Sequence, residues 1–252
     1  MQADVVQAPS RRDRVRAATS QEIVQTARRL LIERGSAAIS LRAIAREMGM
    51  TAPALYRYYA SHEELIHHVI AAIFTELGDY LETAIRDTAR AAAAADAAAA
   101  DATAAKLITA CQAFRTWATA HPAEFGMIFA SPLPGIEMSH IDPLDECGFR
   151  FGLIFLGLFH ELWQNKPFPV PADDELDPGL RAQLARYRRE LGTDLPLGAL
   201  QTFLRCWVQL YGTVSLETFG QLRFALDNSE PMFELMLGDL ASMIGLEYPP
   251  AD

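Results

Sequence analysis

The sequence predicts an all-α protein with a three-helix, helix-turn-helix domain at its N-terminus and a larger helical domain after it. Apolar residues recur at spacings of three and four along almost the whole chain, which is the period of an amphipathic helix. Runs of alternating β-branched residues, which are typical of strands, are missing. With 252 residues, half of them hydrophobic, the chain can bury a sizeable core.

The charged residues are divided unevenly along the chain. The first 60 residues hold ten arginines and five acidic residues, whereas the remainder holds twelve basic and 27 acidic residues. A basic end attracts phosphates, and an acidic body keeps the rest of the molecule away from them. We therefore expect the basic end to bind nucleic acid in spite of the net charge of −10.

Residues 1–18 are expected to form a flexible basic arm. The arm carries Arg11, Arg12, Arg14 and Arg16, which could either enter a minor groove or only keep the arm solvated. The first helix is predicted to start at Thr19 or Ser20, because Thr19 and Glu22 have the spacing of a capping box, and to end at Gly35.

Two short helices follow, joined by a tight turn. One begins at Ser40 and ends at Gly49, which can take the left-handed backbone conformation that the turn requires. The next begins at Thr51. This spacing is typical of a helix-turn-helix, whose second helix enters the major groove of DNA. A longer helix is predicted from Ser61, so residues 19–66 form the DNA-binding domain.

A resemblance to the tetracycline-repressor (TetR) family of bacterial regulators runs through residues 27–66, ARRLLIERGSAAISLRAIAREMGMTAPALYRYYASHEELI. The matching elements are the helix ending at Gly35, Ile44-Ala45, Gly49-Met50-Thr51, Leu55-Tyr56, Tyr59 and Glu63-Glu64-Leu65. A lone helix-turn-helix would be a weak match, but this combination is specific. The resemblance implies a DNA-binding regulator that responds to a small molecule.

The resemblance also implies which residues contact DNA: Ser40, Arg42, Thr51, Ala52, Ala54, Tyr56, Arg57, Tyr58 and His62. Tyr56 and Tyr58 match positions that hydrogen-bond phosphates in such regulators, and Ser40 and Thr51 match helix-start residues that cap and often touch the DNA backbone. Arg57 can reach a phosphate or a guanine edge, and Arg42 a phosphate. Tyr58 could instead pack against the domain, which is the expected role of Tyr59.

The sequence departs from the family pattern in two places. Ala52-Pro53-Ala54 replaces glycine and polar or basic residues, so few hydrogen bonds to bases are expected. Contacts with thymine methyl groups, or readout of DNA shape, then carry more of the specificity. His62 replaces the usual lysine, which makes a phosphate contact there weaker and partly dependent on pH.

Residues 67–252 are predicted to form the ligand-binding and dimerisation domain. The helix from Ser61 carries one apolar stripe, formed by Leu65, Val69, Ile73, Leu77 and Leu81. Residues 89–105 are nearly all alanine and are expected to be a weakly anchored helix extension or a mobile connection. Further helices are predicted at residues 103–120, 122–130, 143–165, 178–191, 197–220 and 231–244, with loops at 131–142 and 166–177.

Aromatic residues at helical spacing are concentrated in this second domain. Core packing accounts for each of them alone, but together they could line an apolar pocket between helices. The candidate ligand-binding residues are Phe114, Trp117, Phe129, Phe151, Phe155, Phe159, Trp163, Trp207 and Tyr211. HPAEFGMIFASPLPG (121–135) and WVQLYGTVSLETFG (207–220) resemble a C-terminal domain of one actinobacterial-looking branch of the TetR family. The resemblance names no ligand, and the aromatic residues favour an apolar or aromatic effector.

The resemblance further implies a homodimer that pairs through its last two helices, Leu197 to Gly220 and Pro231 to Ile244, as a four-helix bundle. Their apolar residues exceed what one core face needs, which agrees with a two-fold interface. Effector binding is expected to tilt the helix from Ser61 and change the separation of two recognition helices, which must be about 34 Å apart. The expected function is a ligand-responsive transcriptional regulator, a repressor released from a pseudo-palindromic operator of double-stranded DNA.

Other functions find little support in the sequence. An enzyme is not predicted, because the chain lacks a G-x-S-x-G elbow, a phosphate-cradling glycine loop and a dinucleotide fingerprint. The histidines at 62, 67 and 68 lack the spacing of a zinc-protease helix, and the three cysteines form no C-x-x-C pair, so neither a metal nor a cofactor is expected. Without an apparent membrane span or signal peptide, a cytoplasmic location is expected. The alternative function is a helical protein-interaction module with a degenerate DNA-binding head.

Overall fold

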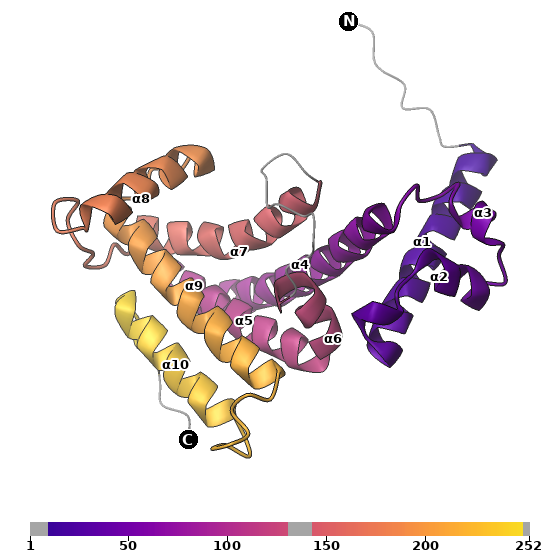
Figure 1. The fold of residues 1–252 in the computed structure, drawn as a ribbon. Helices are drawn as coiled ribbons and strands as arrows, with labels where there is room; N and C mark the ends of the chain where they lie inside the picture. Colours follow the sequence, from indigo (N-terminus) through magenta and orange to yellow (C-terminus); the bar gives the residue numbers. More distant parts are fainter. Residues whose placement is uncertain (1–9, 131–142, 249–252) are drawn as a thin grey trace, which may run out of the picture. The chain divides into compact units, whose positions relative to one another are not determined.

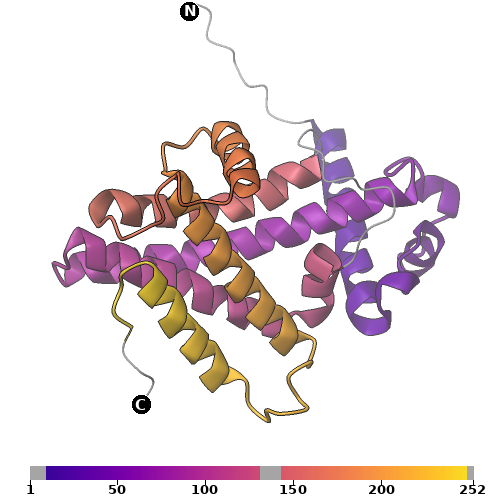
Figure 2. The same cartoon turned by 60° about the vertical axis from the view of Figure 1, so that its left-hand side comes forward.

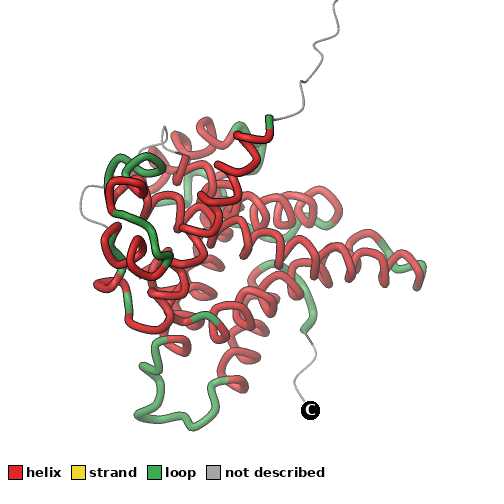
Figure 3. Tube along the Cα trace, turned by 90° about the vertical axis from the view of Figure 1, so that its right-hand side faces the viewer, coloured by secondary structure: helices red, strands yellow, loops and turns green. Residues whose placement is uncertain are grey.

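The computed structural model describes residues 10–130 and 143–248, which contain ten α-helices and no strand (Figure 1, Figure 3). The predicted all-α fold is confirmed. The predicted loop at 131–142 lies outside the described residues, whereas residues 166–177 form a loop as expected. In the described ranges, no helix is both long enough and apolar enough to cross a membrane.

The first helix, α1 (Arg11–Arg34), starts well before the predicted Thr19. Ser10 caps it: the Oγ of Ser10 accepts a hydrogen bond from the backbone N of Asp13 at 3.2 Å, and the Asp13 carboxylate accepts one from Ser10 N at 3.2 Å. This capping box satisfies two backbone N–H groups at the helix start. The prediction of a flexible arm is therefore wrong for residues 11–18, and Thr19 lies inside the helix, where its hydroxyl donates to Val15 O at 3.0 Å.

Two short helices, α2 (Leu41–Glu47) and α3 (Ala52–Leu55), pack together and α2 packs on α1. A one-turn 3₁₀ helix at Ser36–Ala38 joins α1 to α2. The core of this bundle consists of the apolar residues that the helical period selects: Ile23, Ala27, Leu30, Leu31, Ile44, Ala45 and Leu55, each at most 3% exposed. Burial of this stripe, rather than the short helices' own propensity, stabilises the arrangement.

Gly49 forms the turn between α2 and α3. Its φ of +65° lies in the left-handed region, as predicted. The backbone N of Met50 donates to the carbonyl oxygen of Ala45 at 2.8 Å and so closes the end of α2.

Replacing Gly49 by alanine is expected to lower the free energy of unfolding by about 1–2 kcal/mol, the penalty of the left-handed conformation for a residue with a Cβ. A Cβ at this position would meet no atom within 4 Å, so no clash with neighbouring residues adds to the penalty. Urea denaturation measures it. Gly152→Ala is the control, because Gly152 is helical, equally uncrowded and has no positive φ, and there alanine should stabilise. A Gly49→Ala protein as stable as the parent would contradict this turn geometry.

The next helix, α4, spans His62–Ala94. At its start the Oγ of Ser61 accepts a hydrogen bond from Glu64 N at 3.1 Å, and the Glu64 carboxylate accepts one from Ala60 N at 2.6 Å. The predicted stripe of Leu65, Val69, Ile73, Leu77 and Leu81 is confirmed, since all five side chains are fully buried.

The alanine-rich segment forms the ends of two helices and a turn between them. α4 ends at Ala94, α5 (Ala99–Ala120) begins soon after, and Asp96 in the turn has φ +52°. The hydroxyls of Thr88 and Thr109 lie 3.1 Å apart and join the two helices. Residues 89–94 therefore extend α4, as the first predicted alternative has it, and most of residues 91–99 are exposed. Only the end of the segment is firmly anchored, because Thr103 is fully buried and its hydroxyl donates to Glu161 Oε1 at 2.8 Å.

The remaining helices follow the proline and glycine punctuation of the sequence. They are α6 (Pro122–Phe125), which continues as one π-helical turn at Gly126–Ala130, then α7 (Pro143–Asn165), α8 (Pro178–Leu191), α9 (Leu197–Thr218) and α10 (Glu230–Met243). The predicted bounds of α7 and α8 are confirmed. α9 and α10 lie side by side (Figure 1, Figure 2).

The chain divides into two compact units. Of the described residues, the first unit contains 10–75, 123–130 and 143–148, and the second contains 76–122 and 149–248. The first unit therefore contains α6 in addition to the three-helix bundle, although α6 follows α5 of the second unit in the sequence.

Candidate DNA-binding and effector sites

The start of α2 is held by Ser40, whose Oγ accepts a hydrogen bond from the backbone N of Ala43 at 3.1 Å. The predicted capping role of Ser40 is confirmed. Leu41, Ile44 and Ala45 are buried, and this fixes the helix so that Arg42 on its other face is exposed.

The recognition helix α3 is short. Thr51 is its N-cap but makes no capping hydrogen bond through its side chain, so the predicted capping role is wrong for Thr51. Pro53 lies in the first turn, where the N–H that proline lacks would have no partner within the helix. Ala52 and Ala54 are half-buried.

Tyr56 and Arg57 are the outward-pointing residues that follow α3. The side chain of Leu55 is fully buried and anchors the segment, whereas Tyr56 is 51% exposed and Arg57 is exposed. An exposed tyrosine beside an exposed arginine, on a backbone fixed by a buried leucine, provides a hydroxyl donor and a cation for phosphates or base edges.

Tyr58 and Tyr59 pack against α1. The guanidinium of Arg16 lies over the Tyr58 ring, 5.6 Å from its centroid, and donates a hydrogen bond to Arg57 O at 3.2 Å. Tyr59 is 2% exposed and its hydroxyl lies 2.7 Å from Ser20 Oγ, which confirms its predicted core role. The extra turns of α1 thus support the recognition segment, an arrangement that an unstructured arm could not provide.

His62 is exposed but partly engaged within the domain. Its Nε2 donates to the carbonyl oxygen of Ile39 at 2.9 Å, which leaves Nδ1 for any outside contact.

A buried ion pair connects α1 with α6 inside the first unit. The Nε of Arg28 donates to Glu124 Oε1 at 2.8 Å, and a second guanidinium nitrogen lies 2.5 Å from the same oxygen. The Glu124 residue is 1% exposed, and the side chain of Arg28 is 19% exposed. Sequence reasoning missed this pair, because its members are far apart in the chain and belong to no shared motif.

The second unit gathers part of the predicted aromatic set into one cluster. Phe114, Phe151, Phe155 and Trp207 are in mutual ring contact, with centroids 5.5 to 6.1 Å apart. Tyr211 stacks on Trp207 at 5.9 Å. Edge-to-face and tilted pairs of this kind stabilise a core beyond their buried area.

The other predicted aromatic residues lie elsewhere. Phe159 and Trp163 both contact Phe168, at 5.4 and 5.0 Å. Phe129 belongs to the first unit, where its ring contacts Phe74 and Phe125 at 5.6 and 4.9 Å.

Trp117 is 2% exposed and stacks on His121. Its indole N–H has no hydrogen-bond partner among the described residues. A buried donor in this condition can be satisfied by a ligand or a water molecule.

A cavity of about 50 Å³ lies in the second unit. It is lined by Leu107, Ile108, Cys111, Phe155, Phe159, Phe203, Cys206, Trp207, Leu210, Leu237, Leu240, Ala241, Ile244 and Leu246. Phe155, Phe159 and Trp207 were candidate ligand residues, whereas the two cysteines and the residues of α10 were not. The sequence signal for α10 was its apolar residues at helical spacing, which were expected to serve a core face and the dimer interface but not a ligand pocket.

The two cysteines of the cavity are neutral thiols. Burial raises the pKa of Cys111 to about 12 and that of Cys206 to about 11. Among the described residues, no group of three or more histidine, cysteine or acidic side chains could hold a metal ion.

The comparisons with known proteins agree for both parts of the chain. Residues 23–69 match the family model of bacterial regulatory proteins of the tetR family, and residues 107–240 match that of the tetracyclin repressor-like C-terminal domain.

Curated relatives that match most of the chain are named as transcriptional regulators. The HTH-type transcriptional regulators Rv1816 of Mycobacterium tuberculosis and Mb1846 of Mycobacterium bovis are each 29% identical over 203 residues, which covers 79% of this chain and 80% of theirs. The crystal structure of a regulatory protein, SCO4313, is similar with a TM-score of 0.67 and 30% identity, covering 92% of this chain and all of the other. A Rhodococcus sp. RHA1 protein of unknown function shares the fold, with a TM-score of 0.59, 16% identity and coverage of 98% of this chain and all of the other.

An exposed recognition segment on a helix-turn-helix, followed by a helical domain, defines a DNA-binding transcriptional regulator. The chain belongs to the tetracycline repressor (TetR) family, whose members are ligand-responsive DNA-binding repressors. The names of the matching family and relatives are those of transcriptional regulators.

Proposed function

We propose that this regulator binds a pseudo-palindromic operator as a homodimer and is released from it by a small, apolar or aromatic effector. The observation that carries the proposal is the exposed pair Tyr56 and Arg57 on a segment anchored by buried Leu55. The rest of the recognition helix offers only alanines and a proline to the bases, so the grip on the DNA backbone contributes most of the affinity.

The proposed DNA contacts are of two kinds: contacts that position the protein on the DNA backbone and contacts that read the bases. Ser40, Arg42, Thr51, Tyr56 and Tyr58 are proposed to hold phosphates, with His62 contributing through its Nδ1. Ala52 and Ala54 are proposed to meet thymine methyl groups, and Arg57 a phosphate or a guanine.

A second copy of the chain is the proposed partner of α9 and α10. Val208 is 66% exposed on α9, and Leu235 is 67% exposed on α10. Leu216, Phe219 and Met232 are also exposed on or next to these helices. A two-fold interface would cover this apolar surface and bring two recognition helices to one operator.

The effector signal is proposed to pass from α5 through α6 to α1. α5 ends at the Trp117–His121 stack, α6 follows at once, and Glu124 of α6 binds Arg28 of α1. Movement of α4 is the second proposed route, since this helix continues from the first unit into the second. The effector must prefer the state that cannot bind DNA, because equal affinity for both states shifts nothing.

Arg57→Ala is expected to weaken operator binding, and the way in which the loss depends on salt and on DNA sequence shows whether Arg57 contacts a phosphate or a guanine. A lost phosphate contact lowers affinity for all sequences alike and reduces the salt slope by about one, whereas a lost guanine contact costs about 1–3 kcal/mol and relaxes specificity at one base pair. Gel shifts on the neighbouring intergenic DNA, at several salt concentrations, measure both.

The matched control is Arg90→Ala, which removes an exposed arginine of α4 that lies in the second unit. It should leave operator affinity unchanged. If the parent protein selects no DNA fragment and Arg57→Ala matches Arg90→Ala, the operator proposal fails, and a protein-interaction module becomes the better description.

A further inference from the structure

The cavity lies beneath α10, on the side of that helix away from its exposed residues. Leu237, Leu240 and Ala241 line it, whereas Leu235 is 67% exposed. Leu235 and Leu237 are two positions apart, which is about 200° around a helix. The inner face of α10 therefore borders the cavity while its outer face is free for a second copy.

The lining is apolar on every side. Its only side chains with a polar group are Cys111 of α5 and Cys206 and Trp207 of α9, and the remaining lining residues are leucine, isoleucine, phenylalanine and alanine. A cavity of this kind excludes water and accepts apolar molecules. A charged or strongly hydrogen-bonding ligand would lose its hydration without finding a partner.

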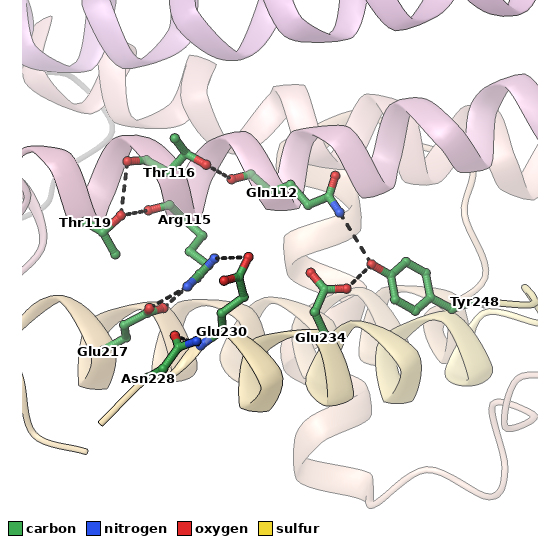
Figure 4. Close-up of polar contacts among 9 residues, drawn as sticks. All are labelled: Gln112, Arg115, Thr116, Thr119, Glu217, Asn228, Glu230, Glu234 and Tyr248. Atoms are coloured by element: carbon green, nitrogen blue, oxygen red, sulfur yellow. Dashed lines mark hydrogen bonds and ion pairs between the residues drawn. The ribbon is translucent and has the colours of Figure 1, made fainter. Parts of the chain in front are cut away.

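The walls of the cavity are tied together by Arg115 of α5. Its guanidinium binds both carboxylate oxygens of Glu217 on α9, each at 2.7 Å (Figure 4). The same guanidinium lies 4.0 Å from Glu230 and 5.0 Å from the centre of the Phe233 ring, both on α10. A bidentate pair with 13–19% side-chain exposure is a strong link between α5 and α9, whereas α10 contacts Arg115 only through Glu230 and Phe233 at its start.

The tail after α10 covers one side of the cavity. Gly245, with φ +66°, turns the chain, and Leu246 then donates from its backbone N to Ala241 O at 2.9 Å and contributes its side chain to the lining. Tyr248 fastens this cover: its hydroxyl donates to the Glu234 carboxylate and accepts from Gln112 Nε2 at 3.4 Å (Figure 4). Two side-chain hydrogen bonds are easier to release than the Arg115 link.

We propose that this cavity binds a small, uncharged, apolar molecule, and that the Leu246–Tyr248 segment is the cover under which the molecule enters. Only one part of this proposal rests on the proposed function, namely that the bound molecule is the effector. An engineered apolar cavity of about 150 Å³ accommodates benzene. At about 50 Å³ this cavity is smaller, so a molecule of that size must displace the cover.

Occupation would act on the dimer. The occupant touches the inner face of α10, so a shift of this helix changes the angle at which its outer face meets a second copy. A route through the dimer interface is separate from the route through α6 and α1.

Benzene is the probe for this site, titrated into the full-length protein without DNA and followed by the rise in Tm and by calorimetry. We expect saturable binding to the parent protein. Ala241→Met fills the cavity and should weaken benzene binding by about 10-fold to 200-fold. Cys206→Met fills it from α9 and should act alike, which keeps the test valid if one of the two variants folds poorly.

Two further variants complete the design. Ala182→Met makes the same side-chain change at an exposed position of α8 and should bind benzene as the parent does. Tyr248→Phe loosens the cover and should speed both association and release of benzene. Binding that neither filling variant weakens, or no saturable binding to the parent, would overturn the proposal. Operator affinity measured without benzene tests the proposed function separately, so the failure of one is distinguishable from the failure of the other.

Discussion

Arg28→Met is expected to lower the free energy of unfolding by about 3–5 kcal/mol, the usual effect of removing one partner of a buried ion pair. The reason is the position of Glu124, which is 1% exposed and accepts two hydrogen bonds from Arg28. Methionine preserves much of the length and apolar stem of arginine but leaves the carboxylate without its cation. Urea denaturation of the full-length protein, followed by circular dichroism, measures the change.

The double variant Arg28→Met, Glu124→Leu should recover most of this loss. Replacing a buried pair by apolar side chains of similar volume is often neutral or stabilising, because the desolvation of both charges is avoided. Arg29→Met is the matched control, since Arg29 is the exposed neighbour on α1, and its effect should stay within about 0.5 kcal/mol. A loss no larger for Arg28→Met than for Arg29→Met would show that the pair does not support the first unit.

The same variants examine the coupling between α6 and DNA binding. If Glu124 transmits the state of α5 to α1, the stable double variant should still bind operator but respond less to an effector. The effect on the free energy of unfolding and the effect on the response to an effector can then be distinguished, because the apolar pair restores packing without restoring the ionic link.

Local signals predicted most of the helices. A proline in the first turn begins both α7 and α8, and the proline-rich loop at residues 166–177 separates them. Gly49 was predicted to be left-handed because a two-helix turn of that length requires it, and its φ of +65° agrees. The start of α1 was predicted wrongly because Thr19 and Glu22 imitate the capping spacing, while the working capping box is Ser10 and Asp13 in a basic segment.

Long-range features were out of reach of the sequence. Helical periodicity shows that Phe155, Phe159 and Trp207 have buried faces, but it does not show which buried faces leave a space between them. The contribution of Cys111, Cys206 and α10 to the cavity depends on how four helices cross. The pair of Arg28 and Glu124 also depends on packing, since α6 folds against the first unit.

Leu235→Glu is expected to convert the dimer into monomers and to lower operator affinity by about 10³-fold or more, the gap between specific and non-specific binding. Leu235 is 67% exposed on α10 and Val208 is 66% exposed on α9, so neither contributes much to the core of its own chain. Two-fold symmetry would place the new carboxylates on both sides of one interface, where like charges cost several kcal/mol. Analytical ultracentrifugation gives the oligomeric state, and gel shifts give the affinity.

The control is Leu153→Glu, the same substitution at a leucine that is 38% exposed on α7. It should leave the protein dimeric, with its operator affinity and Tm unchanged, whereas Leu235→Glu should lose only the stabilisation that association with the second copy contributes. A dimeric Leu235→Glu protein would place the interface elsewhere. A monomer that still selects the operator would show that one recognition helix suffices. We expect the opposite result, because α3 has few groups that read bases. A second half-site must supply the specificity that Ala52 and Ala54 lack.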